Sequence, residues 1–219
     1  MEQNKQRIVV KVGTSTLTHN SGALDLWSME HLVRTLADLQ GMGHEVILVS
    51  SGAIAVGTAK LGLSERPKEL RMKQAAAAVG QCRMMHIYDK FFSEYNRSMA
   101  QILLTGDDVE DPERAEHLSN TFSALLEMGV IPVVNENDSV SSAEIETGRH
   151  KVLGDNDTLS AIVAELCRAD LLVLLSDIDG LYDADPKTHP EAKLLHQVTE
   201  LTPEILEMAG GAGSWRGTV

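Results

Sequence analysis

Aromatic side chains are scarce in this chain: Phe, Trp and Tyr together make up 4% of its 219 residues. Hydrophobic residues nevertheless account for 43%, so the core must be built from aliphatic side chains and methionine. A chain of this length and composition can bury one substantial core. Because no internal repeat or linker interrupts it, we expect a single domain over residues 1–219.

Cysteine is also scarce, with only Cys82 and Cys167, which are far apart and form no C-x-x-C pair. This favours free thiols in a reducing compartment and argues against a structural zinc site. The first five residues are polar and lack the apolar segment of a signal peptide. The longest apolar run, near residues 171–175, is too short to span a bilayer. We therefore expect a soluble, cytoplasmic protein without a membrane segment.

Basic residues are the third deficit, since 19 Lys and Arg face 32 Asp and Glu, for a formal net charge of -13 at pH 7. No basic stripe offsets the repulsion by a phosphate backbone, which argues against nucleic acid as a partner. A small anionic substrate stays compatible with this charge, because a few local cations suffice to bind it.

The stretch Arg7–Ser15 organises the rest of the chain. It begins as an apolar, β-branched run that predicts a buried strand, and it ends in Gly13, Thr14 and Ser15, which predict a turn with free backbone N–H groups. Lys11 interrupts the strand, and a buried lysine is costly unless its charge meets an anion. The stretch therefore suits a phosphate site, although it is not a P-loop. The alternative is that Lys11 lies where the strand surfaces and only solvates the edge.

Further strands alternate with helices along the chain. Such alternation predicts a parallel sheet covered by helices on both faces. Small residues in the long helix predicted over 68–95 predict close approach of a neighbouring element. The predicted strands cover 45–49, 99–104, 130–134 and 170–175, and a short strand and helix follow over 198–208. The predicted helices begin at the cap Ser28, at the turn 50–57 and at Asp111-Pro112, and two more cover 68–95 and 158–167.

Polar clusters follow these strands, and ligands of parallel sheets collect at the carboxyl ends of strands. Turn and cap chemistry explains single Asn or Asp residues there, but less easily such a density of them. The Asp-rich segment 177–185 does not fit an EF-hand, and we interpret it as a loop that faces a nucleotide. The polar segment 139–153 predicts a hairpin or flap over the site. The clusters are Ser50–Gly57, Thr105–Asp108 (more weakly), Asn135–Asp138, Gly154–Asp157 and Ser176–Pro186.

In this order, the motifs at 10–15, 50–57, 135–138, 154–157 and 176–186 resemble those of the glutamate 5-kinase family, within the amino acid kinase superfamily. The resemblance implies an α/β fold, a three-layer αβα sandwich with a mainly parallel central sheet. It also implies transfer of the γ-phosphoryl group of ATP to the side-chain carboxylate of L-glutamate, with Mg²⁺ bridging the phosphates. The product, γ-glutamyl phosphate, would be the first intermediate of proline synthesis.

The resemblance also implies roles for individual residues. Lys11 would stabilise the transferring phosphoryl group, and Asp157 would organise the catalytic lysines. Glutamate would be held by Ser51, Asp138 and Asn156. The segment 139–153 resembles the region where proline acts as feedback inhibitor, and family habit suggests a homodimer or homotetramer. Contacts to the nucleotide would come from Gly13, Thr14, Ser15, Ser176 and Asp177, and from the start of a glycine-rich loop at Gly217 and Thr218.

The sequence departs from the family pattern at that loop, because Val219 ends the chain before the second lysine of the motif. We therefore expect a truncated kinase domain, without a C-terminal RNA-modification-enzyme-like (PUA-like) domain, that binds glutamate better than it turns it over. Three alternatives stay open: a kinase of the same superfamily with another acceptor, a non-catalytic sensor of glutamate or proline, and a purely structural α/β domain.

Overall fold

The computed structural model describes residues 5–19, 21–140 and 156–208. Contacts divide the chain into two compact units, Met1–Leu175 and Ser176–Val219, and each unit is described by itself. The predicted hairpin or flap at 139–153 lies almost wholly outside the described residues. The prediction of one domain over 1–219 stays a prediction.

The first unit is built on a sheet of five strands with the order β3-β4-β2-β1-β5, and every adjacent pair is parallel. The predicted parallel sheet is therefore confirmed. The fourth strand extends further than predicted, because Asn135 and Glu136, which we assigned to the following turn, still pair with β3. The strands are β1 (Arg7–Val12), β2 (Glu45–Val49), β3 (Met99–Leu104), β4 (Ile131–Glu136) and β5 (Leu171–Leu175).

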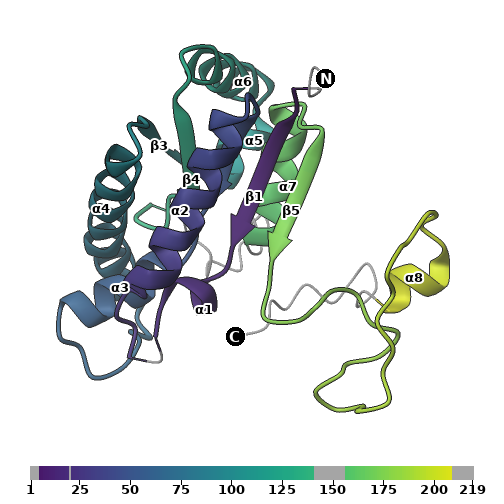
Figure 1. Cartoon of the computed structure of the whole chain (residues 1–219). Helices are drawn as coiled ribbons and strands as arrows, with labels where there is room; N and C mark the ends of the chain where they lie inside the picture. Colours follow the sequence, from purple (N-terminus) through teal and green to yellow (C-terminus); the bar gives the residue numbers. More distant parts are fainter. Residues whose placement is uncertain (1–4, 20, 141–155, 209–219) are drawn as a thin grey trace. The chain divides into compact units, whose positions relative to one another are not determined.

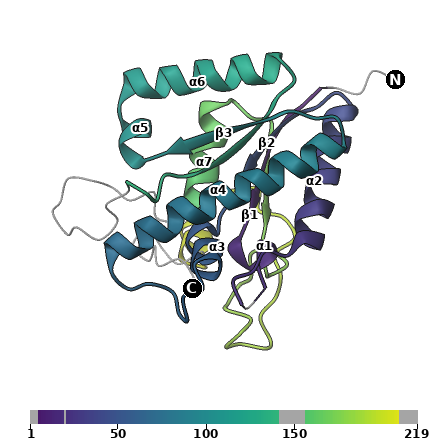
Figure 2. The same ribbon diagram turned by 90° about the vertical axis from the view of Figure 1, so that its left-hand side faces the viewer.

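Helices cover both faces of this sheet, as predicted. One core lies beneath α2 (Leu26–Gly41), α3 (Ala53–Lys60) and α4 (Leu70–Glu94), the long helix that crosses the view in Figure 2. A second core lies beneath α6 (Pro112–Glu127) and α7 (Asn156–Leu166). Both cores are mainly aliphatic. Sequence reasoning missed two short helices, α1 (Thr14–Leu17) and α5 (Gly106–Glu110), which follow β1 and β3 directly.

The start of α2 corrects one prediction. Asp25 caps this helix, and Ser28 donates to the Asp25 carboxylate through both its backbone N–H (3.1 Å) and its hydroxyl (2.9 Å). Ser28 was predicted as the cap, but it is the residue whose otherwise unpaired N–H is satisfied by the cap. The predicted cap at Asp111 is confirmed, because its carboxylate accepts from two N–H groups of α6.

Helices α3 and α4 cross in close contact through two glycines. A Cβ atom on Gly57 would lie 1.8 Å from the carbonyl oxygen of Ala76, and one on Gly80 would lie 1.8 Å from that of Ala53. No side chain fits at such a distance. The predicted close approach therefore takes place here.

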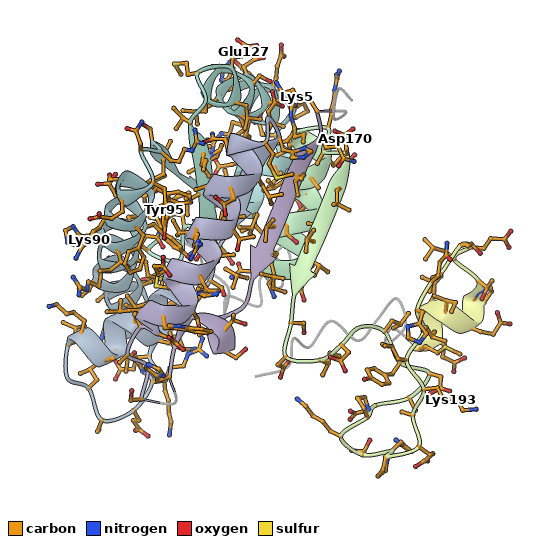
Figure 3. All side chains as sticks on the ribbon, viewed as in Figure 1. Lys5, Lys90, Tyr95, Glu127, Asp170 and Lys193 are labelled. Carbon is orange, nitrogen blue, oxygen red and sulfur yellow. The ribbon has the colours of Figure 1, made fainter. Side chains whose placement is uncertain are left out.

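The arrowheads of β1 and β5 point toward the end of the sheet where α1 and α3 lie (Figure 1). The labelled residues Lys5 and Asp170 mark the opposite end in Figure 3. There Glu45 pairs with Lys5 at 2.6 Å, and the backbone N–H of Arg7 donates to Asp170 at 2.7 Å. Ion pairs and backbone contacts thus tie the strand starts together, at the end remote from the predicted ligand site.

The second unit contains α8 (Pro203–Met208) and an antiparallel bridge between Tyr182 and Leu194. Asp183 closes the same loop, since its carboxylate accepts from the backbone N–H of Lys193 at 2.7 Å. The strand predicted to begin at Val198 is wrong. Residues 198–202 pair with no neighbouring strand in the described part of this unit, and an isolated extended segment has no ladder to stabilise it.

Candidate active site

Lys11 and Asp157 form an ion pair at the carboxyl end of β1. The two side chains approach to 2.6 Å between Nζ and Oδ1. Only 13% of the Lys11 side chain is exposed, against 51% for Asp157. Asp157 lies in the first turn of α7, where the helix dipole favours a carboxylate. The alternative that Lys11 merely solvates the strand edge does not fit a largely buried ammonium directed at a carboxylate.

Hydroxyl groups from two adjacent turns lie beside this strand end. Ser51 donates from Oγ to the carbonyl oxygen of Val12 at 2.9 Å, and Thr14 donates from Oγ1 to Ser51 Oγ at 3.3 Å. Gly52 adopts φ +96°, and a Cβ there would lie 3.2 Å from Thr14. The turns after β1 and β2 are therefore packed against each other, and the positive φ at Gly52 favours glycine there.

Gly13 lies beside the Lys11 ammonium. A Cβ on Gly13 would be in ordinary van der Waals contact with Lys11 Nζ at 3.6 Å and with Ser15 Oγ at 3.8 Å. Ser15 is exposed. The structure thus places Gly13, Thr14, Ser15 and Ser51 near the Lys11–Asp157 pair. The roles predicted for these residues stay predictions.

A cavity of about 390 Å³ opens beside the end of β4. Helix α4 forms one wall, β3 forms another, and the segment after β4 that carries Asp138 lies at its border. Asn137 anchors that segment, because its backbone N–H donates to the carbonyl oxygen of Leu104 at 2.7 Å. The lining residues are Ala53, Ala77, Ala78, Gln81, Cys82, Met85, Gln101, Leu103, Glu136, Asn137, Asp138 and Ser139.

The cavity lies at the same edge of the sheet as the Lys11–Asp157 pair and the Ser51 turn. Ala53, one of its lining residues, follows Ser51 by two positions, and Ser50 at the end of β2 donates its N–H to Val134 of β4 at 2.8 Å. Carboxyl ends of neighbouring parallel strands share one sheet edge. Asp138, Ser51 and Lys11 therefore follow one another along that edge, on turns after β4 and β2 and on β1.

Asp138 is a half-buried carboxyl group in surroundings that disfavour its charge. Burial and, to a smaller extent, the nearby Glu136 carboxylate raise its pKa to about 6, and the Arg66 guanidinium partly opposes both. A carboxylate in such surroundings gains strongly from a cationic ligand group. This property fits the prediction that Asp138 contacts an amino acid.

The remaining predicted residues are less closely defined. Asn156 is half-buried and begins α7 next to Asp157. Ser176 and Asp177 are exposed in the second unit, where Asp177 pairs with Lys187 at 3.6 Å. Their contact with a nucleotide stays a prediction. Gly217 and Thr218 lie outside the described residues.

Sequence reasoning missed the α4 wall of the cavity. We predicted this helix for its length and small residues and did not name Gln81 or Cys82 as site residues. The available signal was Gln81 itself, a glutamine directly after the small residues 75–80 that let another element approach. In the described parts of the chain, no cluster of three or more His, Cys, Asp or Glu could hold a metal ion. None of the described helices is both long and apolar enough to cross a bilayer.

Comparison with known proteins places these observations in a family. The profile of the Amino acid kinase family matches residues 6–214. A glutamate 5-kinase of Clostridium perfringens is 56% identical over 216 residues, which are 99% of this chain and 80% of the relative. One of Clostridium acetobutylicum is 54% identical, over 98% of this chain and 78% of the relative. One of Caldanaerobacter subterraneus is 54% identical, but the match covers 55% of its length.

Solved structures support the same fold. A UMP kinase from Ureaplasma parvum aligns with TM-score 0.58 at 15% identity, covering 95% of this chain and 86% of the other. An isopentenyl phosphate kinase from T. acidophilum gives TM-score 0.58 at 18% identity, with 87% and 79% covered. The parallel sheet covered by helices is thus the fold that this chain shares with these two kinases. The chain belongs to the amino acid kinase family.

Proposed function

We propose that this protein transfers the γ-phosphoryl group of ATP to the side-chain carboxylate of L-glutamate, giving γ-glutamyl phosphate and ADP. The observation that carries the proposal is the Lys11–Asp157 ion pair, which holds a largely buried ammonium at the edge where Ser51 and Asp138 also lie. The choice of glutamate as the substrate rests on the similar relatives that are named glutamate 5-kinase.

The chemistry needs positioned cations and donors more than a base. A carboxylate oxygen of glutamate attacks the γ-phosphorus, and the bond to the β-bridging oxygen breaks. The acceptor is already ionised at pH 7, so no proton has to be removed. Two anions must meet, and fixed positive groups offset their repulsion while charge spreads over the transferring group.

Lys11 supplies the positive charge that offsets this repulsion. Asp157 is a positioning residue that fixes the direction of the Lys11 ammonium. Gly13, Thr14 and Ser15 offer N–H and hydroxyl groups to the phosphates. Mg²⁺ enters as part of the MgATP substrate, since this ion is commonly held by substrate phosphates and waters and not by an all-protein cage.

Glutamate is held by Ser51, Asp138 and Asn156 in this proposal. The half-buried Asp138 carboxylate suits the α-ammonium group, which would be a specific advantage of a free amino acid over an acylated one. The remaining nucleotide contacts, at Ser176 and Asp177 and from Gly217 and Thr218, complete the proposal. Inhibition by proline, a dimeric or tetrameric state, and a cytoplasmic location stay predictions.

The test is ADP release that depends on glutamate, measured with the full chain. We expect Lys11→Met to lower the rate by a factor of about 10²–10³, the usual effect of removing one charge-stabilising donor. Lys5→Met is the matched control, because it also removes a lysine with a carboxylate partner, at the other end of the sheet. Equal rates for the wild type and Lys11→Met would contradict the proposed mechanism.

A binding experiment tests the acceptor independently of turnover. Thermal shifts are compared for glutamate, aspartate, N-acetylglutamate and UMP at one concentration. Stabilisation by glutamate alone supports the proposal, and stabilisation by N-acetylglutamate or UMP indicates another acceptor. Glutamate or proline binding without ADP release under any condition indicates an amino-acid sensor.

A further inference from the structure

Gln81 is a buried glutamine in the α4 wall of the cavity. Its residue is 8% exposed, and Asn135 beside it on β4 is 2% exposed. Asn135 donates from Nδ2 to Gln81 Oε1 at 2.9 Å. The two side chains thus connect the helix wall of the cavity to the strand that leads to Asp138.

The backbone fixes which way these two amides face. Asn135 Oδ1 accepts the N–H of Glu136 at 2.9 Å, so the Asn135 amide must turn its NH₂ group toward Gln81. Gln81 accepts this bond with its only side-chain acceptor, Oε1, and its own NH₂ group must face away from Asn135. The donor of Gln81 is therefore set in direction before any ligand arrives.

That donor has no partner among the residues that the structure describes: Nε2 is buried and unpaired. An unpaired buried donor is unfavourable, and native proteins keep few of them without a reason. Here the unpaired donor belongs to a residue that lines a cavity together with two carboxylate residues, Glu136 and Asp138. A donor on the α4 wall and carboxylates at the end of β4 and after it match the carboxylate and ammonium groups of an α-amino acid.

We propose that Gln81 determines specificity for a free α-amino acid, by donating from Nε2 to the α-carboxylate of the substrate while Asp138 binds its α-ammonium group. This inference rests on the proposed function and names the residue that recognises the head of the substrate. The sheet order supports the orientation. The cavity lies at β3 and β4, and Lys11 lies on β1 beyond β2, so the side chain of the substrate extends along the edge toward the phosphoryl site.

The test compares dissociation constants of glutamate and 4-aminobutyrate, which keeps the amine and the reacting carboxylate but lacks the α-carboxylate. The wild type should prefer glutamate by a factor on the order of 10–100, the usual value for a hydrogen bond to a charged group. Gln81→Met should lose most of that preference, because glutamate binding weakens and 4-aminobutyrate binding does not. Gln6→Met, which replaces an exposed glutamine directly before β1 and outside the cavity lining, is the control and should keep the preference.

A second variant guards against a simple folding defect, since Gln81→Met also removes the acceptor of Asn135. Gln81→Glu keeps that acceptor and should weaken glutamate binding more than 4-aminobutyrate binding, through repulsion of the α-carboxylate. In the wild type, the Gln81 side-chain amide signal in ¹⁵N NMR should shift with glutamate and not with 4-aminobutyrate. That signal decides the question even where neither variant folds.

The outcomes separate the two proposals. If the wild type binds glutamate but both variants keep its preference over 4-aminobutyrate, the role of Gln81 is refuted and the proposed function stands. An unchanged Gln81 amide signal at saturating glutamate refutes the role of Gln81 in the same way. If the wild type does not bind glutamate, the proposed function and this inference fail together.

Discussion

Replacement of Asp138 by asparagine should stabilise the free protein at neutral pH. Burial and the neighbouring Glu136 raise the pKa of Asp138 to about 6, from an ordinary value of 3.8. The folded state therefore holds this proton more tightly than the unfolded state. Between pH 4 and pH 6 the free energy of unfolding falls as pH rises, and above pH 6 the whole cost of the ionised carboxylate is present.

The magnitude follows from that difference in pKa. Roughly 2 units at about 1.4 kcal/mol each set an upper value near 3 kcal/mol. Because Asp138 is only half-buried, water screens part of this cost, and we expect about 1–2 kcal/mol. The free energy of unfolding of Asp138→Asn should thus exceed that of the wild type by about 1–2 kcal/mol at pH 7.5. The difference should vanish near pH 4.

Urea unfolding followed by circular dichroism from pH 4 to pH 8 measures this difference directly. Asp89→Asn, an exposed substitution on α4, is the control and should change stability by less than about 0.5 kcal/mol at every pH. Saturating glutamate should stabilise the wild type more than Asp138→Asn, since the ammonium loses its partner. The reasoning is refuted if Asp138→Asn is less stable than the free wild type at pH 7.5.

Three further predictions address packing, ligand binding and catalysis. In urea unfolding, Gly80→Ala should destabilise the protein by about 3 kcal/mol or more, because the new Cβ would clash with the backbone of α3. Gly41→Ala is the control and should be nearly neutral, because its Cβ would meet only the end of a flexible guanidinium. Glutamate affinity, measured by calorimetry, should weaken as pH falls below about 6, because a proton competes with the ammonium group for Asp138; an affinity independent of pH from 5 to 7 would argue against that contact. Asp157→Asn should lower the rate of ADP release while the melting temperature stays within a few degrees, and loss of the folded state would mean that this carboxylate is only a structural cap.

The sequence predicted the sheet well because its strands are continuous apolar runs bounded by turn residues. β1 and β2 have the predicted limits, and the long helix α4 differs from its predicted range by only a few residues. Such segments carry their own signal, since a buried parallel strand has to be apolar on both faces. The missed elements are short. α1 consists of a single turn whose residues were assigned to a loop.

The site residues differ in how far the sequence alone could identify them. Lys11 stood out because a charge in an apolar strand has few explanations, and the structure gives it a carboxylate partner. Gln81 did not stand out, because one polar residue in a long helix is ordinary until its neighbours in space are known. Asn135, which fixes its orientation, is 54 residues away. No local pattern reports contacts over that separation, and only the fold brings the two amides together.

The contact between Gly57 and Gly80 has a mechanical consequence. It joins the helix that begins directly after the Ser51 turn to the helix that carries Gln81, with backbone against backbone and no side chain between them. Because backbone lies against backbone, α3 and α4 cannot shift along each other without moving apart. In the proposed binding mode, this contact would hold Gln81, at the α-carboxylate of the amino acid, at a fixed distance from the Ser51 turn.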